Sequence, residues 1–347
     1  MLFEFASYGS PRHMIDHLQN RKDRQRWIAV GVCLASFLGL YWFLGYSAGY
    51  GVMVDGVTMF ERRPLVSTIR LDYLRDDGEW GFGYFVPLAV AGLFWMRRRE
   101  LLGTEVRPAL WTGGAVTAIA LFIYWAGYRG EQKYFGYIAG QLLVLGALLW
   151  FLGFVWFRKI FWLWMLLGMM WPWRFLIEPI SNPLQLIMAK MTAGFLKIFG
   201  VGAVANGSGV STDSIDPVDG SFIAMDIDVG CSGMRSLFAL VMIGLVFAFL
   251  RVRDEWKRWL LMALVPVVAV LGNFVRMLLL YVGSLIWGTD VAIGKAHQMS
   301  PFHMVAGLVV FAVALVVMSL TVELLEKGAK FFRRRKIVRK QVVRAAT

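Results

Sequence analysis

One cysteine in the chain has the sequence setting of a reactive thiol. Cys231 lies in Gly230-Cys231-Ser232-Gly233, between a strand-like segment and the start of an apolar stretch. A thiol at a helix N-terminus ionises more readily, because unpaired backbone N–H groups and the helix dipole stabilise negative charge. The flanking glycines let a substrate approach the backbone closely. The pattern indicates a nucleophilic thiolate, and an inert small core residue is the alternative that this residue alone leaves open.

An arginine lies inside a later apolar stretch. Arg276 follows Trp259 by 17 residues (276 − 259), which is about 25 Å along a helix and near the edge of a ~30 Å hydrocarbon core. An arginine at the centre of a transmembrane helix costs roughly 2.5–3.5 kcal/mol on insertion, so arginines within the membrane usually face the protein interior or water. Asn273, one turn earlier on the same face, is placed to orient the guanidinium. Snorkelling of the arginine to lipid headgroups is the alternative.

A histidine follows a helix-start signal. Ser300-Pro301 is a typical N-cap and N1 pair, so His303 is predicted in the first turn of a helix. His297 is its competitor in the preceding loop. A cysteine and a histidine form a nucleophile–base pair, and a guanidinium stabilises an oxyanion or holds a carboxylate. No metal-ligand spacing or phosphate-binding glycine motif accompanies them, so we expect no metal and no cofactor.

The elements that must position these residues are membrane spans. The 347-residue chain is 58% hydrophobic and 17% charged, whereas a soluble domain carries roughly a quarter charged residues. Its net charge of +13 is gathered in short runs at the ends of apolar stretches, as the positive-inside rule predicts. We therefore expect a membrane protein with no nucleic-acid partner. Its two cysteines, Cys33 and Cys231, fall at opposite membrane faces and are predicted to be free thiols.

The predicted fold is an all-α polytopic membrane protein of about eight transmembrane helices. A cytoplasmic segment (1–26) precedes the membrane domain (27–326), and a basic cytoplasmic tail (327–347) that contacts anionic lipid follows it. Basic connections fall on one side, so both termini are predicted cytoplasmic and Cys231, Arg276 and His303 extracytoplasmic. The spans are expected near 27–46, 82–96, 111–127, 135–157, 160–176, 234–250, 259–281 and 302–324.

Two outer connections are long, one at 50–80 and one at 177–230. In the second, apolar residues recur at helical spacing from Pro183 to Phe199, with lysines between them, which predicts an amphipathic helix at the interface. A turn signal follows at 216–220, and residues 222–229 alternate as a strand does. We expect this extracytoplasmic helix and a short β-hairpin to lead to Cys231, and a small capping loop at 50–80.

Three sequence blocks carry a family resemblance. CSGMRSL, GNFVRM and FHMVAG resemble the signature blocks of the exosortase/archaeosortase family of membrane transpeptidases. GFGYFVPLAVAGLFWMRRREL and PLQLIMAKMTAGFLKIFGV are similar to two further blocks, so the resemblance runs in order over most of 75–325. A departure occurs at 81–83, where many relatives have a histidine. The resemblance implies that the catalytic residues are Cys231, Arg276 and His303. Ser232, Gly233, Asn273 and Arg235 are expected to support them or to bind the substrate.

The resemblance also implies an activity: a cysteine protease or transpeptidase at the outer face of a prokaryotic inner membrane. Its partners would be exported proteins whose C-terminal tail has a PEP-CTERM-like signal, a transmembrane helix and a basic cluster. A surface lipid or glycan would accept the product. A transporter or channel with an anion site at Arg276 stays open, although the sequence shows no paired broken helices at the midplane. A lipid- or glycan-modifying enzyme with the same outer-face site also stays open.

Overall fold

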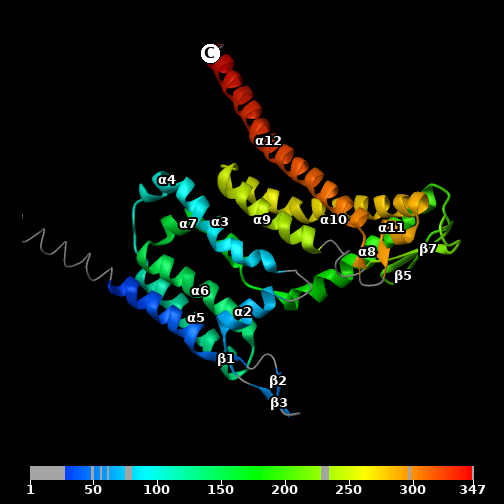
Figure 1. Ribbon diagram of the computed structural model, residues 1–347. Coiled ribbons are helices and arrows are strands. Elements are labelled where there is room, and N and C mark those ends of the chain that lie inside the picture. The colour runs from blue at the N-terminus through cyan, green and yellow to red at the C-terminus, as the bar shows by residue number, and fades with distance from the viewer. Residues whose placement is uncertain are drawn as a thin grey trace, which may run out of the picture. The chain divides into compact units, whose positions relative to one another are not determined.

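The computed structural model describes residues 28–47, 51–54, 57–60, 62–74, 80–227, 234–295 and 298–345, with backbone alone at 51–60 within these ranges and at 235, 295, 298–299 and 328–345. Cys231, Ser232 and Gly233 lie outside these residues, and the side chain of Arg235 is not described. The chain forms two compact units, residues 1–80 with 104–157 and residues 81–103 with 158–347 (Figure 1).

The first unit is built around two long helices. Helices α5 (Leu110–Arg129) and α6 (Lys133–Phe151) pack closely because a Cβ at Gly113 or Gly146 would overlap the facing helix. A buried ion pair joins Asp72 of α2 to Lys133 of α6, with a 2.8 Å separation. The unit also contains a helix at Ile28–Phe43 that ends in the π-helical turn η1 (Gly39–Phe43), α2 (Leu65–Tyr73), and the antiparallel pairs β1 (Gly45–Ser47) with β4 (Arg63–Pro64) and β2 (Gly51–Val54) with β3 (Val57–Phe60).

The second unit surrounds one helix, α10 (Glu255–Trp287). Helices α8 (Ile177–Ile198), α9 (Met234–Leu250) and α12 (Pro301–Ala345) all pack against it. Helix α7 (Phe154–Gly168) leads into this unit. The other elements are η2 (Gly81–Phe85), α3 (Val86–Met96), α4 (Arg98–Leu102), η3 (Arg174–Leu176), β5 (Val204–Asn206), β6 (Gly209–Ile215), β7 (Phe222–Asp226), α11 (Thr289–Ala292), β8 (Gly294–Lys295) and β9 (Gln298–Met299).

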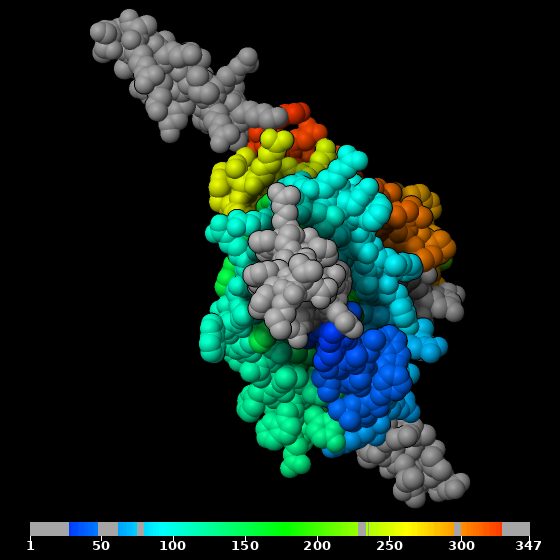
Figure 2. Space-filling view, turned by 90° about the vertical axis from the view of Figure 1, so that its left-hand side faces the viewer, coloured from blue at the N-terminus to red at the C-terminus, as the bar shows by residue number. Residues whose placement is uncertain are grey.

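Membrane character is evident from the described helices. Four of them, α5, α6, α10 and α12 up to Lys327, are long and apolar enough to cross a bilayer. Shorter apolar helices lie at Ile28–Phe43, Gly81–Met96 and Ser236–Leu250. The first of these, blue in Figure 2, exposes Ile28, Val32 and Leu34, as a helix surrounded by lipid does. The prediction of a helical membrane protein is therefore confirmed, and each of the eight predicted stretches contains helix.

The boundary between the fourth and fifth predicted stretches is wrong. Helix α6 ends at Phe151 rather than near residue 157, and α7 begins at Phe154. Gly153 adopts a φ of +82° and donates its N–H to the Leu148 carbonyl, which is the usual glycine ending of a helix. Arg158 and Lys159, which fall between the predicted stretches 135–157 and 160–176, consequently lie inside α7.

The connection before Cys231 also differs from its prediction. Instead of a two-stranded hairpin, it folds into a three-stranded antiparallel sheet in the order β5-β6-β7. The additional strand pairs through a two-residue turn in which Asn206 faces Gly209 and Gly207 has a φ of +59°. The two loop residues are Gly207-Ser208, and a Gly-Ser pair between two strand-like segments is a hairpin signal, so this strand was visible in the sequence. Helix α8 begins at Ile177, not at Pro183, which is an interior residue.

Two polar contacts fasten this sheet to α10 and α11. The hydroxyls of Ser214 and Tyr281 are 2.7 Å apart. The Asp216 carboxylate accepts hydrogen bonds from the backbone N–H groups of Thr289 at 2.6 Å and Val218 at 2.8 Å. The β6–β7 turn is therefore tied to the end of α10.

The hydrogen bonds to the Asp216 carboxylate predict how the stability of the fold depends on pH. The N–H groups of Thr289 and then Val218 lower the pKa of Asp216. Its contribution to stability is complete above the unfolded-state pKa of about 3.9 and is lost as the pH falls through the lower native pKa. Thermal unfolding in detergent between pH 7 and 3 should show this loss in the native chain and a smaller loss in Asp216→Asn. Identical pH dependence in both proteins would contradict the assignment.

At the other end of α10, charged side chains hold the neighbouring helices together. Lys257 of α10 is buried and contacts Asp254 at 2.7 Å and Glu326 of α12 at 3.4 Å. Arg97, at the end of α3, donates a 2.6 Å hydrogen bond to the carbonyl of Leu250, the last residue of α9. These contacts fix the lengthwise positions of α3, α9, α10 and α12 against one another.

Candidate functional site

Arg276 lies on the inward face of α10. Asn273, Met277 and Leu280, which share this face at helical spacing, are buried. The Nε atom of Arg276 and the Oδ1 atom of Asn273 are both inaccessible to solvent. An arginine stays charged in proteins, so the guanidinium places a permanent positive charge in a poorly solvated region, where its field is strong.

The facing helix makes room for this guanidinium at a glycine. A Cβ atom on Gly307 of α12 would stand 3.4 Å from both Cζ and Nε of Arg276. His303 lies four residues before Gly307, hence on the same face of α12. Its side chain is 2% exposed and interacts electrostatically with Arg276. The structure therefore brings Arg276 and His303 together from two helices.

The start of α12 was predicted correctly. The Ser300 hydroxyl accepts a 3.0 Å hydrogen bond from the His303 N–H and donates one of 2.9 Å to the Ala292 carbonyl. Ser300 is thus the N-cap, Pro301 is the first helical residue, and His303 lies in the first turn. The cap holds the backbone of His303 against the end of α11.

Helix α9 begins at the level of this pair. The short connection 251–254 makes α9 and α10 antiparallel, and a Cβ at Gly244 would contact Val265. Met234 lies ten residues before Gly244, and Val275 ten residues after Val265. Because both helices rise about 1.5 Å per residue, the first turn of α9 lies beside Arg276. Met234 is buried, so this end of α9 is anchored in the protein.

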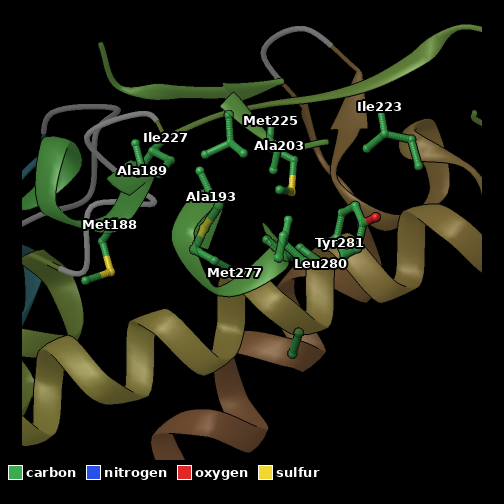
Figure 3. Packing of buried hydrophobic residues seen from close by; sticks show 13 residues of the cluster. Met188, Ala189, Ala193, Ala203, Ile223, Met225, Ile227, Met277, Leu280 and Tyr281 are labelled. Carbon is green, nitrogen blue, oxygen red and sulfur yellow. The ribbon is translucent and has the colours of Figure 1, made fainter. Parts of the chain in front are cut away.

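A cluster of buried hydrophobic residues packs between the three-stranded sheet and the part of α10 and α12 that carries Arg276 and His303. It joins α8, β7, α10 and α12, and includes Ile227, Met277 and Ala306. Figure 3 shows Met188 and Ala193 of α8 gathered with Met225, Met277 and Tyr281. Ile227 and Met234 therefore anchor both ends of the segment that contains Cys231. Among the predicted site residues, Arg276, His303 and Asn273 are described; Cys231, Ser232 and Gly233 are not, and Arg235 is described only as backbone.

Gly307 contributes to the candidate site but was not predicted from the sequence. Gly307 belongs to the FHMVAG block, and its spacing of four from His303 places both residues on one helical face. That spacing was the available signal, but the contact with Arg276 depends on how α10 and α12 pack.

The chain matches the family model of transmembrane exosortases over residues 74–320, more than half of its length. The chain belongs to the transmembrane exosortase family. The matched region of this exosortase contains all three signature blocks, and the resemblance seen in the sequence is confirmed. Searches of curated proteins and of solved structures found no match.

Proposed function

We propose that this exosortase is a membrane cysteine transpeptidase that cleaves the C-terminal sorting tails of exported proteins. The observation that carries the proposal is the pairing of Arg276 with His303 where α9 begins, three residues after Cys231. Over those three residues the covalent chain spans at most about 11 Å. A nucleophile, a base and an oxyanion-stabilising cation are thereby available to one substrate carbonyl.

The proposed reaction has two halves. The Cys231 thiolate attacks the carbonyl carbon of the scissile peptide bond, and the C–N bond breaks as His303 gives a proton to the leaving amine. The product is a thioester between the substrate and Cys231. His303 then takes a proton from an incoming nucleophile, which attacks the thioester and releases the thiolate. A surface lipid or glycan is the proposed acceptor, and water in its place gives simple hydrolysis.

Arg276 stabilises the negative oxygen of each tetrahedral intermediate. Its guanidinium lies beside Gly307 of α12, and this packing is proposed to hold it in place before the reaction, so that little reorganisation is required. Asn273 is proposed to orient Arg276. Ser232, Gly233 and Arg235 are proposed to support the thiolate or bind the substrate from the start of α9.

The proposed topology has eight crossings, with both termini in the cytoplasm and the site facing outward in a prokaryotic inner membrane. The four long apolar helices support half of these crossings. The others are assigned to the helices at Ile28–Phe43, Gly81–Met96, α7 and α9. The basic runs between the spans give the orientation.

The proposal is tested with a tail-bearing substrate in reconstituted membranes. An exported reporter ending in signal, transmembrane helix and basic cluster should be shortened near the signal when the exosortase is present. A reporter lacking the signal but retaining the helix and basic cluster should remain intact. Absence of cleavage, together with saturable uptake of an anionic solute by the same vesicles, would favour a transporter and contradict the proposal.

The packing of Gly307 against Arg276 gives a graded prediction. Gly307→Ala should retain activity, because its Cβ would sit at an ordinary van der Waals distance of 3.4 Å. Gly307→Val adds two methyl groups there and should displace the guanidinium, lowering kcat roughly 10²-fold. Single-turnover cleavage measured beside thermal unfolding separates misplacement from misfolding. Equal kcat for the folded Ala and Val variants would show that this contact does not position Arg276.

A further inference from the structure

We propose that the β6–β7 turn is a membrane-binding surface that inserts its apolar side chains among lipid headgroups beside the end of α10. The surface, named here the β6–β7 patch, consists of Ile215, Val218 and Phe222. It is independent of the proposed catalytic activity. Its partner is the bilayer that α10 enters.

The side chains of this patch do not belong to the core. Ile215 is 62% exposed, Val218 74% and Phe222 69%. Ile215 and Phe222 are paired across β6 and β7, so they adjoin on the same face of the sheet. The opposite face already buries Ile223 and Met225. Three large apolar side chains gathered at one tip therefore mark a contact surface rather than scattered exposure.

The patch continues onto the surface of α10. Val218 contacts the backbone position of Gly288, where a Cβ would overlap it, and Asp216 accepts the N–H of Thr289. Trp287, immediately before Gly288, is 50% exposed. The sheet, α10 and α11 lie together in Figure 1. The β6–β7 patch thus extends an apolar helix end that carries an exposed indole.

The length of α10 places this end in the headgroup layer. Trp259 and Trp287 are both exposed and are separated by 28 residues (287 − 259). A helix covers about 42 Å over that distance, which matches a bilayer thickness of roughly 40–45 Å including headgroups. Tryptophans concentrate at both membrane–water interfaces. A turn tied to residues 288 and 289 accordingly meets lipid headgroups rather than bulk water.

Insertion of the β6–β7 patch would fix the depth of the whole sheet. The hydrogen bonds of Asp216 and Ser214 transmit the position of the turn to α10, and β7 leads towards the Cys231 segment. A bilayer is favoured over a second copy of this chain because the patch is continuous with the end of α10, a helix long and apolar enough to cross a membrane.

Site-specific labelling tests this assignment. In a Cys33→Ser, Cys231→Ser background, Val218→Cys or Phe222→Cys is labelled with the environment-sensitive fluorophore NBD in nanodiscs that hold one copy. Asn206→Cys is the matched control, because the β5–β6 turn lies at the opposite end of β6. Cys231 is dispensable because the measurement requires no catalysis.

We expect blue-shifted emission at 218 and 222, and at least about threefold stronger quenching by headgroup-level spin-labelled lipid than at 206. Aqueous emission without quenching at both patch positions would overturn the proposal. Shielding that appears only when two copies share a nanodisc would assign the β6–β7 patch to self-association and overturn it equally. A phospholipid-free detergent sample sets the unquenched reference.

Discussion

Replacement of Cys231 by alanine should reduce cleavage of a tail-bearing substrate to background, a loss of about a thousandfold or more. The reason is chemical, because no other group at the proposed site forms the acyl intermediate. Cys231→Ser should be nearly as inactive, since a hydroxyl ionises far less readily than a thiol next to a helix N-terminus. Cleavage rates are measured in vesicles at matched protein levels.

Cys33 provides the matched control. It is the only other cysteine in the sequence and is an exposed free thiol in the helix at Ile28–Phe43. Cys33→Ser should cleave at the native rate, and alkylation should inactivate it because Cys231 is still present. The native chain should keep its activity under alkylation when a substrate analogue protects Cys231. Full cleavage by Cys231→Ala would refute the cysteine mechanism even if family membership stands.

Loss of the Arg276 guanidinium is the second large effect. Arg276→Ala should lower kcat by roughly 10²–10³-fold, the usual consequence of removing one oxyanion-stabilising donor. Arg276→Lys keeps the charge but loses the planar set of donors, so it should recover only part of the rate. Because the interaction is strongest in the transition state, kcat should fall while KM changes little.

Arg258→Ala is the control for this variant. Arg258 lies on the same helix but 18 residues away (276 − 258), about 27 Å along its axis, and pairs with Glu255. This substitution should leave kcat unchanged. A raised KM with native kcat for Arg276→Ala would contradict oxyanion stabilisation and make Arg276 a substrate-binding residue.

Local signals in the sequence predicted much of the fold. Hydropathy located helices in all eight apolar stretches, and Ser300-Pro301 predicted the beginning of α12. The turn at 216–220 and strand β7 followed from residue type and alternation. Each of these features depends on a few neighbouring residues, so one sequence suffices to predict it.

The features that were missed depend on tertiary packing or on a single glycine. The break at Gly153 divides an apolar run in which hydropathy alone detects no boundary. Helix α8 extends before Pro183 because Ile177 and Ser181 are buried. The Arg276–Gly307 contact joins two helices whose packing is not encoded in either block alone. For the candidate site, residue types therefore suggested the chemistry, and helix packing supplied the pairing of Arg276 with His303.

The most direct test of the central claim is mass spectrometry of the exosortase trapped during turnover. After rapid mixing with a tail-bearing substrate and acid quenching, the peptide containing Cys231 should carry the N-terminal portion of the substrate as a thioester. Hydroxylamine should release that adduct, and the peptide containing Cys33 should remain unmodified. Turnover that proceeds with no adduct on Cys231, or with a hydroxylamine-stable adduct on another residue, would contradict the proposed function.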